Sequence, residues 1–388
     1  MLAVYNVEEG VVWEIALRDV AVLCGRNASG TKSSLRSDLE EAVLSEAAAK
    51  LTTKQSTTPS PELPRRVLSI DMGVRNLAYC LLEADPRGGP AKLIAWERLS
   101  LIDEDEARQA DAATKKSLFT PPRLATIAAR LVRDRLLALE PTHVVIERQR
   151  SRSGGGMAVL EWTMRVNSLE AMLHGIFAYH QVSQARQKIQ SVEAVSPKRV
   201  SVFLLRGGIG DGTSRDQCPQ TATTKEKDIK DVKEAFIAGI LRAAVDGRKE
   251  ATKGTKTAKT TKTTTAKTKA AMADRGTLLS YDERASPMVE AYMVRWDAKQ
   301  KRLRPKEAKA AAKSKTSKGG VDDNDDSGGI SDNDQKTTVT NLLPTLSKID
   351  DLADCVAQGL IWLEWEHNKG ILRDEGADAL LEEKQLPG

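Results

Sequence analysis

Five acidic residues lie where a carboxylate is unusual, and together they could hold divalent cations. Asp71 ends one apolar run of the chain and Glu147 ends another. Three more lie within five residues of an amphipathic stretch near the C-terminus: Asp350, Asp351 and Asp354. Oxygen ligands drawn from three separate segments suit Mg²⁺ or Mn²⁺ and not zinc. Two such ions close together activate a water molecule and stabilise the leaving oxygen in phosphodiester hydrolysis.

Most of these carboxylates also have an ordinary structural explanation. Asp71 could be a turn residue that bonds its own backbone. Asp350 and Asp351 could cap a helix, because negative charge is favourable at a helix N-terminus. That explanation leaves Asp354, about one turn later, without a role. On a helix Asp350 lies about 40° from Asp354 and Asp351 about 60° from it on the other side, so either could share a site with Asp354.

The segments that must position these carboxylates alternate between short apolar runs and amphipathic stretches. Strands are expected at residues 67–71, 77–82, 91–98, 143–147 and 190–195. Helices are expected at residues 122–139, 157–179, 227–242 and 347–369, and from residue 197 onward. This order predicts an α/β core over residues 65–205, which the acidic helix in residues 341–388 completes.

A small helical unit is expected over residues 1–48, followed by a linker over 49–64 that contains three prolines. Its sequence LRDVAVLCGRNASGTKSSLRSDLEEAV resembles the SAP motif, a helix–extended–helix DNA-binding module. A plain helical hairpin is the alternative. The resemblance puts four polar residues at a helix start, where backbone N–H groups and a lysine can hold a phosphate: Ser29, Gly30, Thr31 and Lys32.

An insertion over residues 206–340 interrupts the α/β order and is expected to be partly helical. Residues 252–269 are almost wholly Lys, Thr and Ala, and residues 321–334 are rich in Asp and Gly, so both tracts are expected to be disordered. The basic tract could contact DNA, although a solvated insertion is the simpler interpretation. Hydrophobic residues make up only 40% and aromatics 4% of the chain, which also indicates that part of it has no core.

Several classes of site are disfavoured by what the sequence lacks. The four cysteines form no CxxC pair and the four histidines no HxxxH pair, which disfavours a zinc site or a disulfide framework. No GxxxxGK[ST] motif is present, so nucleotide-triphosphate chemistry is disfavoured, and no small-molecule cofactor is expected. No apolar run is long enough for a membrane span, and no targeting peptide is visible. The net charge of +5 is compatible with a polyanionic partner.

The order of elements together with this acidic set resembles the ribonuclease H-like superfamily. Local motifs resemble, more narrowly, the fungal mitochondrial Holliday junction resolvases, relatives of bacterial RuvC: IDMGVRNLAYCLLE, VVIERQRSR, EWTMRVNSLEAML, AVSPKRV and KIDDLADCVAQG. The resemblance covers residues 66–98, 122–205 and 347–368, and also the SAP-like stretch, since the family carries such a segment at its N-terminus. It implies a five-stranded mixed sheet flanked by helices. It also implies a mitochondrial homodimer that cuts four-way DNA junctions symmetrically with Mg²⁺, for which Mn²⁺ can substitute.

Carried over residue by residue, the resemblance assigns catalysis and metal binding to Asp71, Glu147, Asp354 and one of Asp350 and Asp351. Asp351 matches the Asp-x-x-Asp spacing of RuvC, whereas Asp350 has the better helical geometry, so both stay candidates. The sequence departs from the family pattern in the long insertion between Leu205 and Leu342.

Basic residues beside the acidic ones are expected to contact DNA. The loop from Arg148 to Arg152 follows Glu147 directly and could be a solvated basic loop. Its place beside acidic residues favours a phosphate clamp, because Arg holds phosphate oxygens bidentately. Outside the N-terminal unit the expected contacts are Arg75, Asn76, Arg148, Gln149, Arg150, Arg152, Lys198 and Arg199.

Three functions remain open on the sequence. The first is a junction-resolving endonuclease, with the helix at 157–179 as the dimer contact. The second is another ribonuclease H-like nuclease, acting on an RNA–DNA hybrid or on branched DNA. The third is a junction-binding protein without turnover, which the complete set of carboxylates disfavours.

Overall fold

A mixed sheet forms the centre of the protein, as a computed structural model of the chain describes it. The structure describes residues 10–53, 64–85, 89–102, 108–109, 111, 118–149, 161–183, 189–206, 226–254, 278–313 and 348–384. Within them the strands follow the order β5-β4-β1-β2-β3-β6. Their bounds are β1 (Arg65–Asp71), β2 (Leu77–Ala84), β3 (Ala91–Leu99), β4 (His143–Glu147), β5 (Ser191–Val195) and β6 (Leu279–Tyr281).

The sheet confirms the predicted α/β fold and corrects its strand count. The first three strands pair antiparallel, and β4 and β5 run parallel to β1. All five predicted strands are present, but the expectation of five was one short. The sixth strand, β6, pairs parallel with β3. It has only three residues, too few for the alternation of apolar and polar residues that marks a strand in sequence.

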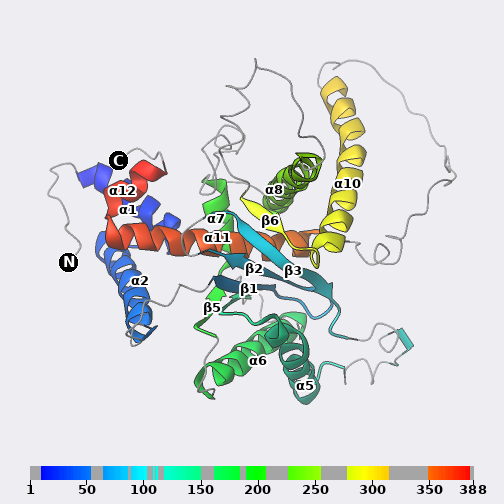
Figure 1. Cartoon of the computed structure of the whole chain (residues 1–388), viewed down its shortest axis with the longest axis horizontal. Coiled ribbons are helices and arrows are strands. Elements are labelled where there is room, and N and C mark those ends of the chain that lie inside the picture. The colour runs from blue at the N-terminus through cyan, green and yellow to red at the C-terminus, as the bar shows by residue number, and fades with distance from the viewer. Residues whose placement is uncertain are drawn as a thin grey trace.

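Helices cover both faces of the sheet (Figure 1). One face packs on α5 (Pro121–Leu131), the irregular turns η1 (Val132–Leu136) and η2 (Leu137–Leu139), and α6 (Glu161–Ser183). The other packs on α7 (Pro197–Leu205) and α11 (Asp350–Asp374). Adjacent strand residues such as Val67 and Leu68 belong to opposite clusters, because side chains alternate across a strand.

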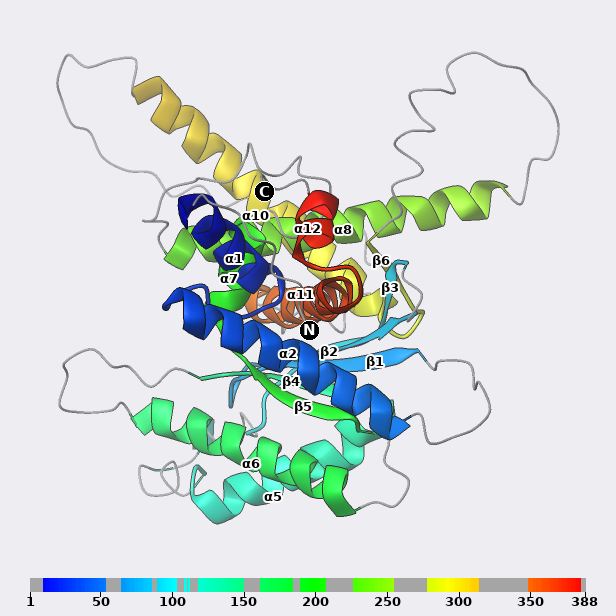
Figure 2. The ribbon, with the colours of Figure 1, turned by 90° about the vertical axis from the view of Figure 1, so that its left-hand side faces the viewer.

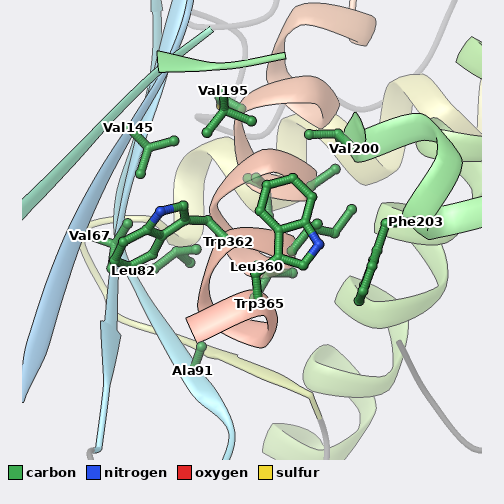
Figure 3. Packing of buried hydrophobic residues seen from close by; sticks show 14 of the residues in the cluster. Val67, Leu82, Ala91, Val145, Val195, Val200, Phe203, Leu360, Trp362 and Trp365 are labelled. Atoms are coloured by element: carbon green, nitrogen blue, oxygen red, sulfur yellow. The ribbon is translucent and has the colours of Figure 1, made fainter. Parts of the chain in front are cut away.

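The long helix α11 organises the second face. It lies on β1 and β2, and Gly359 permits the closest approach, since a Cβ there would lie 2.7 Å from Leu82 Cδ1. Figure 3 shows Trp362 and Trp365 of this helix between the sheet and α7. The ring N–H of Trp96 donates a hydrogen bond to Leu352 O at 3.1 Å, which ties β3 to the first turn of α11.

Parts of the segment at 206–340 are built into this face. It contains two helices where helix was expected, α8 (Glu226–Gly254) and α10 (Ser286–Lys313). Ile237, Leu241, Leu279 and Tyr292 are buried in the same cluster as α11. The predicted disorder of the Lys/Thr tract at 252–269 is wrong for its first three residues, which continue α8 to Gly254. The rest of that tract and the Asp/Gly tract at 321–334 lie outside the described residues, so the expected disorder there stays a prediction.

The N-terminal unit consists of α1 (Gly10–Leu23) and α2 (Lys32–Thr53), and it packs on the C-terminal part of α11 beside α12 (Ala377–Glu383) (Figures 1 and 2). The buried Asn368 side chain donates a hydrogen bond to Leu23 O at 2.8 Å. Gly25, with φ of +67°, lies directly against the Trp365 ring. The unit therefore shares its core with the rest of the protein. No helix among the described residues is long and apolar enough to cross a membrane.

Candidate active site

Two of the predicted carboxylates meet at the ends of neighbouring parallel strands. Ile70 pairs with Ile146 in the register of β1 and β4, so Asp71 and Glu147 follow side by side. A hydrogen bond joins their carboxyl groups, and Asp71 is only 8% exposed. Glu147 Oε2 also accepts hydrogen bonds from Gln149 Nε2 at 3.1 Å and from the backbone N–H of Met72 at 3.5 Å. The strand ends thus fix both acids in one place.

A third carboxylate, Asp354 of α11, completes a pocket around this pair. The pocket is lined by Asp71, Glu147, Pro197, Val200, Lys233, Asp354 and Gln358. Gln358 follows Asp354 by one helical turn and is 4% exposed. Its amide N–H groups donate to Ser69 Oγ at 3.1 Å, to Ile70 O at 3.3 Å and to Val145 O at 3.4 Å. Gln358 therefore holds this part of α11 over the ends of β1 and β4.

Burial and neighbouring acids raise the pKa values of three acids here, Asp71, Asp351 and Asp354. Burial, the hydrogen bond to Glu147 and the charges of Glu147, Asp354 and Asp351 hold the pKa of Asp71 well above its usual range. Burial also raises the pKa of Asp354, although Lys233 opposes the change. Burial and Asp350 raise the pKa of Asp351 to about 6. A pocket in which carboxylates disfavour one another's ionisation is suited to a cation.

Each acid of α11 has a different basic partner. Lys233 Nζ lies 3.0 Å from Asp354 Oδ1, and Lys230 Nζ lies 3.3 Å from Asp350 Oδ2. Both lysines belong to α8. Arg98 of β3 lies 3.3 Å from Asp351 and also donates to Asn76 Oδ1. Of the three acids, only Asp354 lines the pocket with Asp71 and Glu147.

The all-carboxylate donor set fits a hard divalent cation by its chemistry. Across the described part of the chain, no three acidic, histidine or cysteine side chains converge closely enough to coordinate an ion as they stand. Asp71 and Glu147 bond each other, and Asp354 is held by Lys233 instead. Asp71, Glu147 and Asp354 would hold such an ion, which would compete with Lys233 for Asp354.

The predicted DNA contacts divide into three groups. Gln149 touches the site through Glu147, and its backbone N–H also bonds Glu170 of α6. The side chain of Asn76 accepts a hydrogen bond from Arg98. Four further residues lie on segments beside the pocket: the exposed Arg75, Arg148 and Lys198, and the half-buried Arg199. The exposed residues Ser29, Gly30, Thr31 and Lys32 lie at the start of α2 and do not line the pocket. Arg150 and Arg152 lie outside the described residues.

Four residues of the site were not predicted: Arg98, Glu170, Lys233 and Gln358. Lys233 is 7% exposed although it belongs to a segment interpreted as an insertion. The signal available was the spacing of Lys230 and Lys233, which puts two lysines on one face of α8. Gln358 could be found only as a polar residue within the apolar stripe of α11.

Comparisons with known proteins identify the family of this chain. A family model described as "Mitochondrial resolvase Ydc2 / RNA splicing MRS1" matches residues 67–371, a range that contains all five acids. The mitochondrial cruciform cutting endonuclease 1 of Schizosaccharomyces pombe is 31% identical over 199 residues, which cover 49% of this chain and 75% of that protein.

Two solved structures are similar at lower identity. The yeast mitochondrial Holliday junction resolvase Ydc2 superposes with a TM-score of 0.48 at 16% identity, over 95% of this chain and 99% of that one. Thermus thermophilus RuvC gives a TM-score of 0.22 at 14% identity, over 43% of this chain and 89% of its own. Because the family model matches more than half of the chain, this protein belongs to the mitochondrial resolvase Ydc2 / RNA splicing MRS1 family.

Proposed function

We propose that the chain is a mitochondrial endonuclease that resolves four-way DNA junctions by Mg²⁺-dependent hydrolysis of opposed strands. The observation that carries this proposal is the pocket in which Asp71, Glu147 and Asp354 come together from two strand ends and a helix. The relatives support it, since one is named a cruciform cutting endonuclease and another a Holliday junction resolvase. The family description also includes an RNA splicing protein, so membership alone does not select the reaction.

Asp71, Glu147 and Asp354 would hold the ion. When bound there, Mg²⁺ supplies an activated water molecule and neutralises charge on the leaving oxygen. The protein's own part is to fix the ligands. Gln149 donates a hydrogen bond that orients Glu147, and the hydrogen bond from Gln358 to Ser69 holds the helix that carries Asp354 against the sheet. Asp351 is the better candidate for a fourth ligand, because its charge acts on Asp71. Asp350 instead forms an ion pair with Lys230 of α8.

The DNA would lie across the end of the sheet at which β1 and β4 terminate, because the pocket lies there. Arg148 leaves β4 immediately after Glu147, and Lys198 and Arg199 begin α7, whose Pro197 lines the pocket. These side chains could position phosphates on both sides of the cut, since such contacts set register without reading sequence. The loop through Arg150 and Arg152 continues from the same point in sequence.

A second copy of the chain would supply the second incision. On the side of α6 that faces away from the buried Leu169 and Leu173, the exposed apolar residues are Met164, Tyr179 and Val182, the last with 87% of its surface accessible. An exposed apolar helix face is typical of an interaction site. A two-fold dimer through α6 would give two equivalent active sites for the two opposed strands.

A substrate panel tests the proposed function against its alternatives. The protein would be incubated with Mg²⁺ and a synthetic four-way junction, a matched duplex, a flap, an RNA–DNA hybrid and a structured RNA. We expect cutting of the junction at least ten times faster than of the other substrates. Preferred cutting of the hybrid would indicate another ribonuclease H-like nuclease. Binding without cutting of any substrate would indicate a non-catalytic nucleic-acid-binding protein.

A further inference from the structure

Three arginines from separate segments of the chain gather where the N-terminal unit meets the core. Arg26 follows α1, Arg148 follows β4, and Arg199 lies in the first turn of α7. Arg199 Nη1 donates a hydrogen bond to Gly25 O at 3.3 Å, which brings it beside Arg26. The backbone N–H of Arg148 donates to Val195 O at 2.8 Å, next to the residue that precedes α7. These two hydrogen bonds bring the three segments that carry the arginines together.

Two acidic side chains act on this cluster by their charge without forming an ion pair with it: Asp38 on Arg199, and Glu170 with Arg148. Burial, followed by the charges of Arg26 and Arg148, lowers the pKa of Arg199, and the charge of Asp38 opposes the change. Over the described residues no acidic side chain forms an ion pair with any of the three. The Nε of Arg26 is buried and has no hydrogen-bond partner there. Like charges held together without an ion-pair partner are unfavourable unless an anion joins them.

Arg206, at the C-terminal end of α7, is an arginine with a structural role at the same boundary between the core and the N-terminal unit. It also reaches from α7 to the N-terminal unit, but it forms an ion pair with Asp19 of α1. The fold thus provides an ion-pair partner for Arg206, whereas no acidic side chain in the described ranges forms an ion pair with the cluster. This difference indicates that the cluster is kept for a ligand.

The cluster is continuous with the catalytic pocket. Arg148 directly follows Glu147, and Pro197 and Val200 of α7, on either side of Lys198 and Arg199, line the pocket. An anion bound here would lie beside the position of the scissile phosphate.

We propose that Arg26, Arg148 and Arg199 form one binding site for a backbone phosphate of the DNA strand that is being cut. The site deepens the proposed function and rests on it. It makes the N-terminal unit a fixed part of the substrate surface, because Arg26 comes from that unit and the other two arginines from the core. The strand is then held at a set distance from Asp71 and Glu147.

The test measures junction binding by the whole protein in EDTA, where no cutting takes place, as a function of salt. One phosphate contact contributes about one unit to the slope of log Kd against log salt. We expect Arg26→Gln and Arg199→Gln each to weaken binding about tenfold or more and to reduce the slope by about one. The double variant should lose about one unit of slope and not two, because both residues bind the same phosphate. Arg206→Gln, the matched control, should leave the slope unchanged.

A stability measurement separates ligand binding from a structural role. Without DNA, Arg26→Gln should melt at the same temperature as the wild type or higher, because like-charge repulsion is relieved. Inorganic phosphate should raise the melting temperature of the wild type and of Arg206→Gln more than that of Arg26→Gln. If Arg199→Gln does not fold, Arg26→Gln and Arg148→Gln carry the same test.

Three results would overturn the shared site: an unchanged slope in Arg26→Gln, slope losses that add in the double variant, or an equal loss in Arg206→Gln. Failure of the proposed function is a separate outcome. If the wild type binds junctions with the expected slopes but never cuts them, the phosphate site stands and the nuclease assignment falls. If the substitutions weaken binding of a structured RNA as much as binding of the junction, RNA would be the ligand and the proposal of a DNA phosphate would be contradicted.

Discussion

The position of α11 on the sheet depends on a glycine that can be tested against a neighbour on the same helix. Gly359 is buried, and a Cβ there would lie 2.7 Å from Leu82 Cδ1 and 3.1 Å from Ser69 Cβ. A Cβ at Gly370 would have Arg373 Nη2 as its nearest atom, at 3.9 Å. Alanine can therefore be accommodated freely at Gly370 and only with displacement at Gly359.

The two substitutions share one favourable contribution and differ in one unfavourable contribution. Replacing a helical glycine by alanine stabilises a helix interior by about 1 kcal/mol at either position. Forcing a methyl group into a packed core costs about 1–3 kcal/mol. Leu82 and Ser69 are both fully buried on the sheet and have little room to move. We therefore expect Gly359→Ala to be less stable than Gly370→Ala by about 1–3 kcal/mol.

Urea denaturation of both variants and the wild type measures this difference in the free energy of unfolding. Gly370→Ala should be more stable than the wild type. Gly359→Ala should also lose cleavage activity, because a shift of α11 moves Gln358 and Asp354 away from the ends of β1 and β4. Equal stabilities for the two alanine variants would refute the close packing of α11 on the sheet.

Three further predictions concern the acids, the lysine and the N-terminal unit. In EDTA the raised pKa of Asp71 means that its contribution to stability is present below about pH 4 and is lost as pH rises through its folded-state pKa. The free energy of unfolding of Asp71→Asn, minus that of the wild type, should thus increase between pH 4 and pH 8 in urea titrations, and a constant difference would contradict this. Lys233→Met leaves Asp354 without its basic partner and should cost on the order of 2 kcal/mol without metal, with a larger recovery on adding Mg²⁺ than in the wild type. Equal recovery in thermal melts would argue against competition between lysine and ion. Gly25→Ala should loosen the N-terminal unit, because a Cβ there overlaps the Trp365 ring and φ is positive. The rate of amide hydrogen exchange in α1 and α2 should therefore rise. An unchanged rate would show that the unit does not depend on this contact.

The strand ends and the acidic helix could be predicted because their signals are local. Asp71 and Glu147 each interrupt an apolar run, and parallel neighbours bring such ends together. Asp354 stood out because helix capping does not explain an acid in the second turn. The choice between Asp350 and Asp351 could not be made locally, since it depends on Lys230 and Arg98 from other elements.

The residues that were missed act through contacts distant in sequence. Lys233 reaches Asp354 across 121 positions of the chain, and its own segment looks like a polar insertion. Strand β6 is too short to show a pattern and forms only because β3 offers a free edge. Nothing near Gly25 in sequence reveals that Trp365 packs on it. Local propensity identifies elements, whereas these contacts exist only once the whole fold has formed.

Cleavage of a synthetic four-way junction by the wild type and by Glu147→Gln, with Mg²⁺, tests the central claim most directly. The substitution removes one charge from the pocket with little change of shape, so junction binding in EDTA should stay near the wild-type value. The account predicts paired, symmetric cuts in opposed strands by the wild type and a loss of cutting of at least a hundredfold in the variant. Cutting by Glu147→Gln at a rate near that of the wild type, with binding intact, would contradict the assignment of this pocket as the active site.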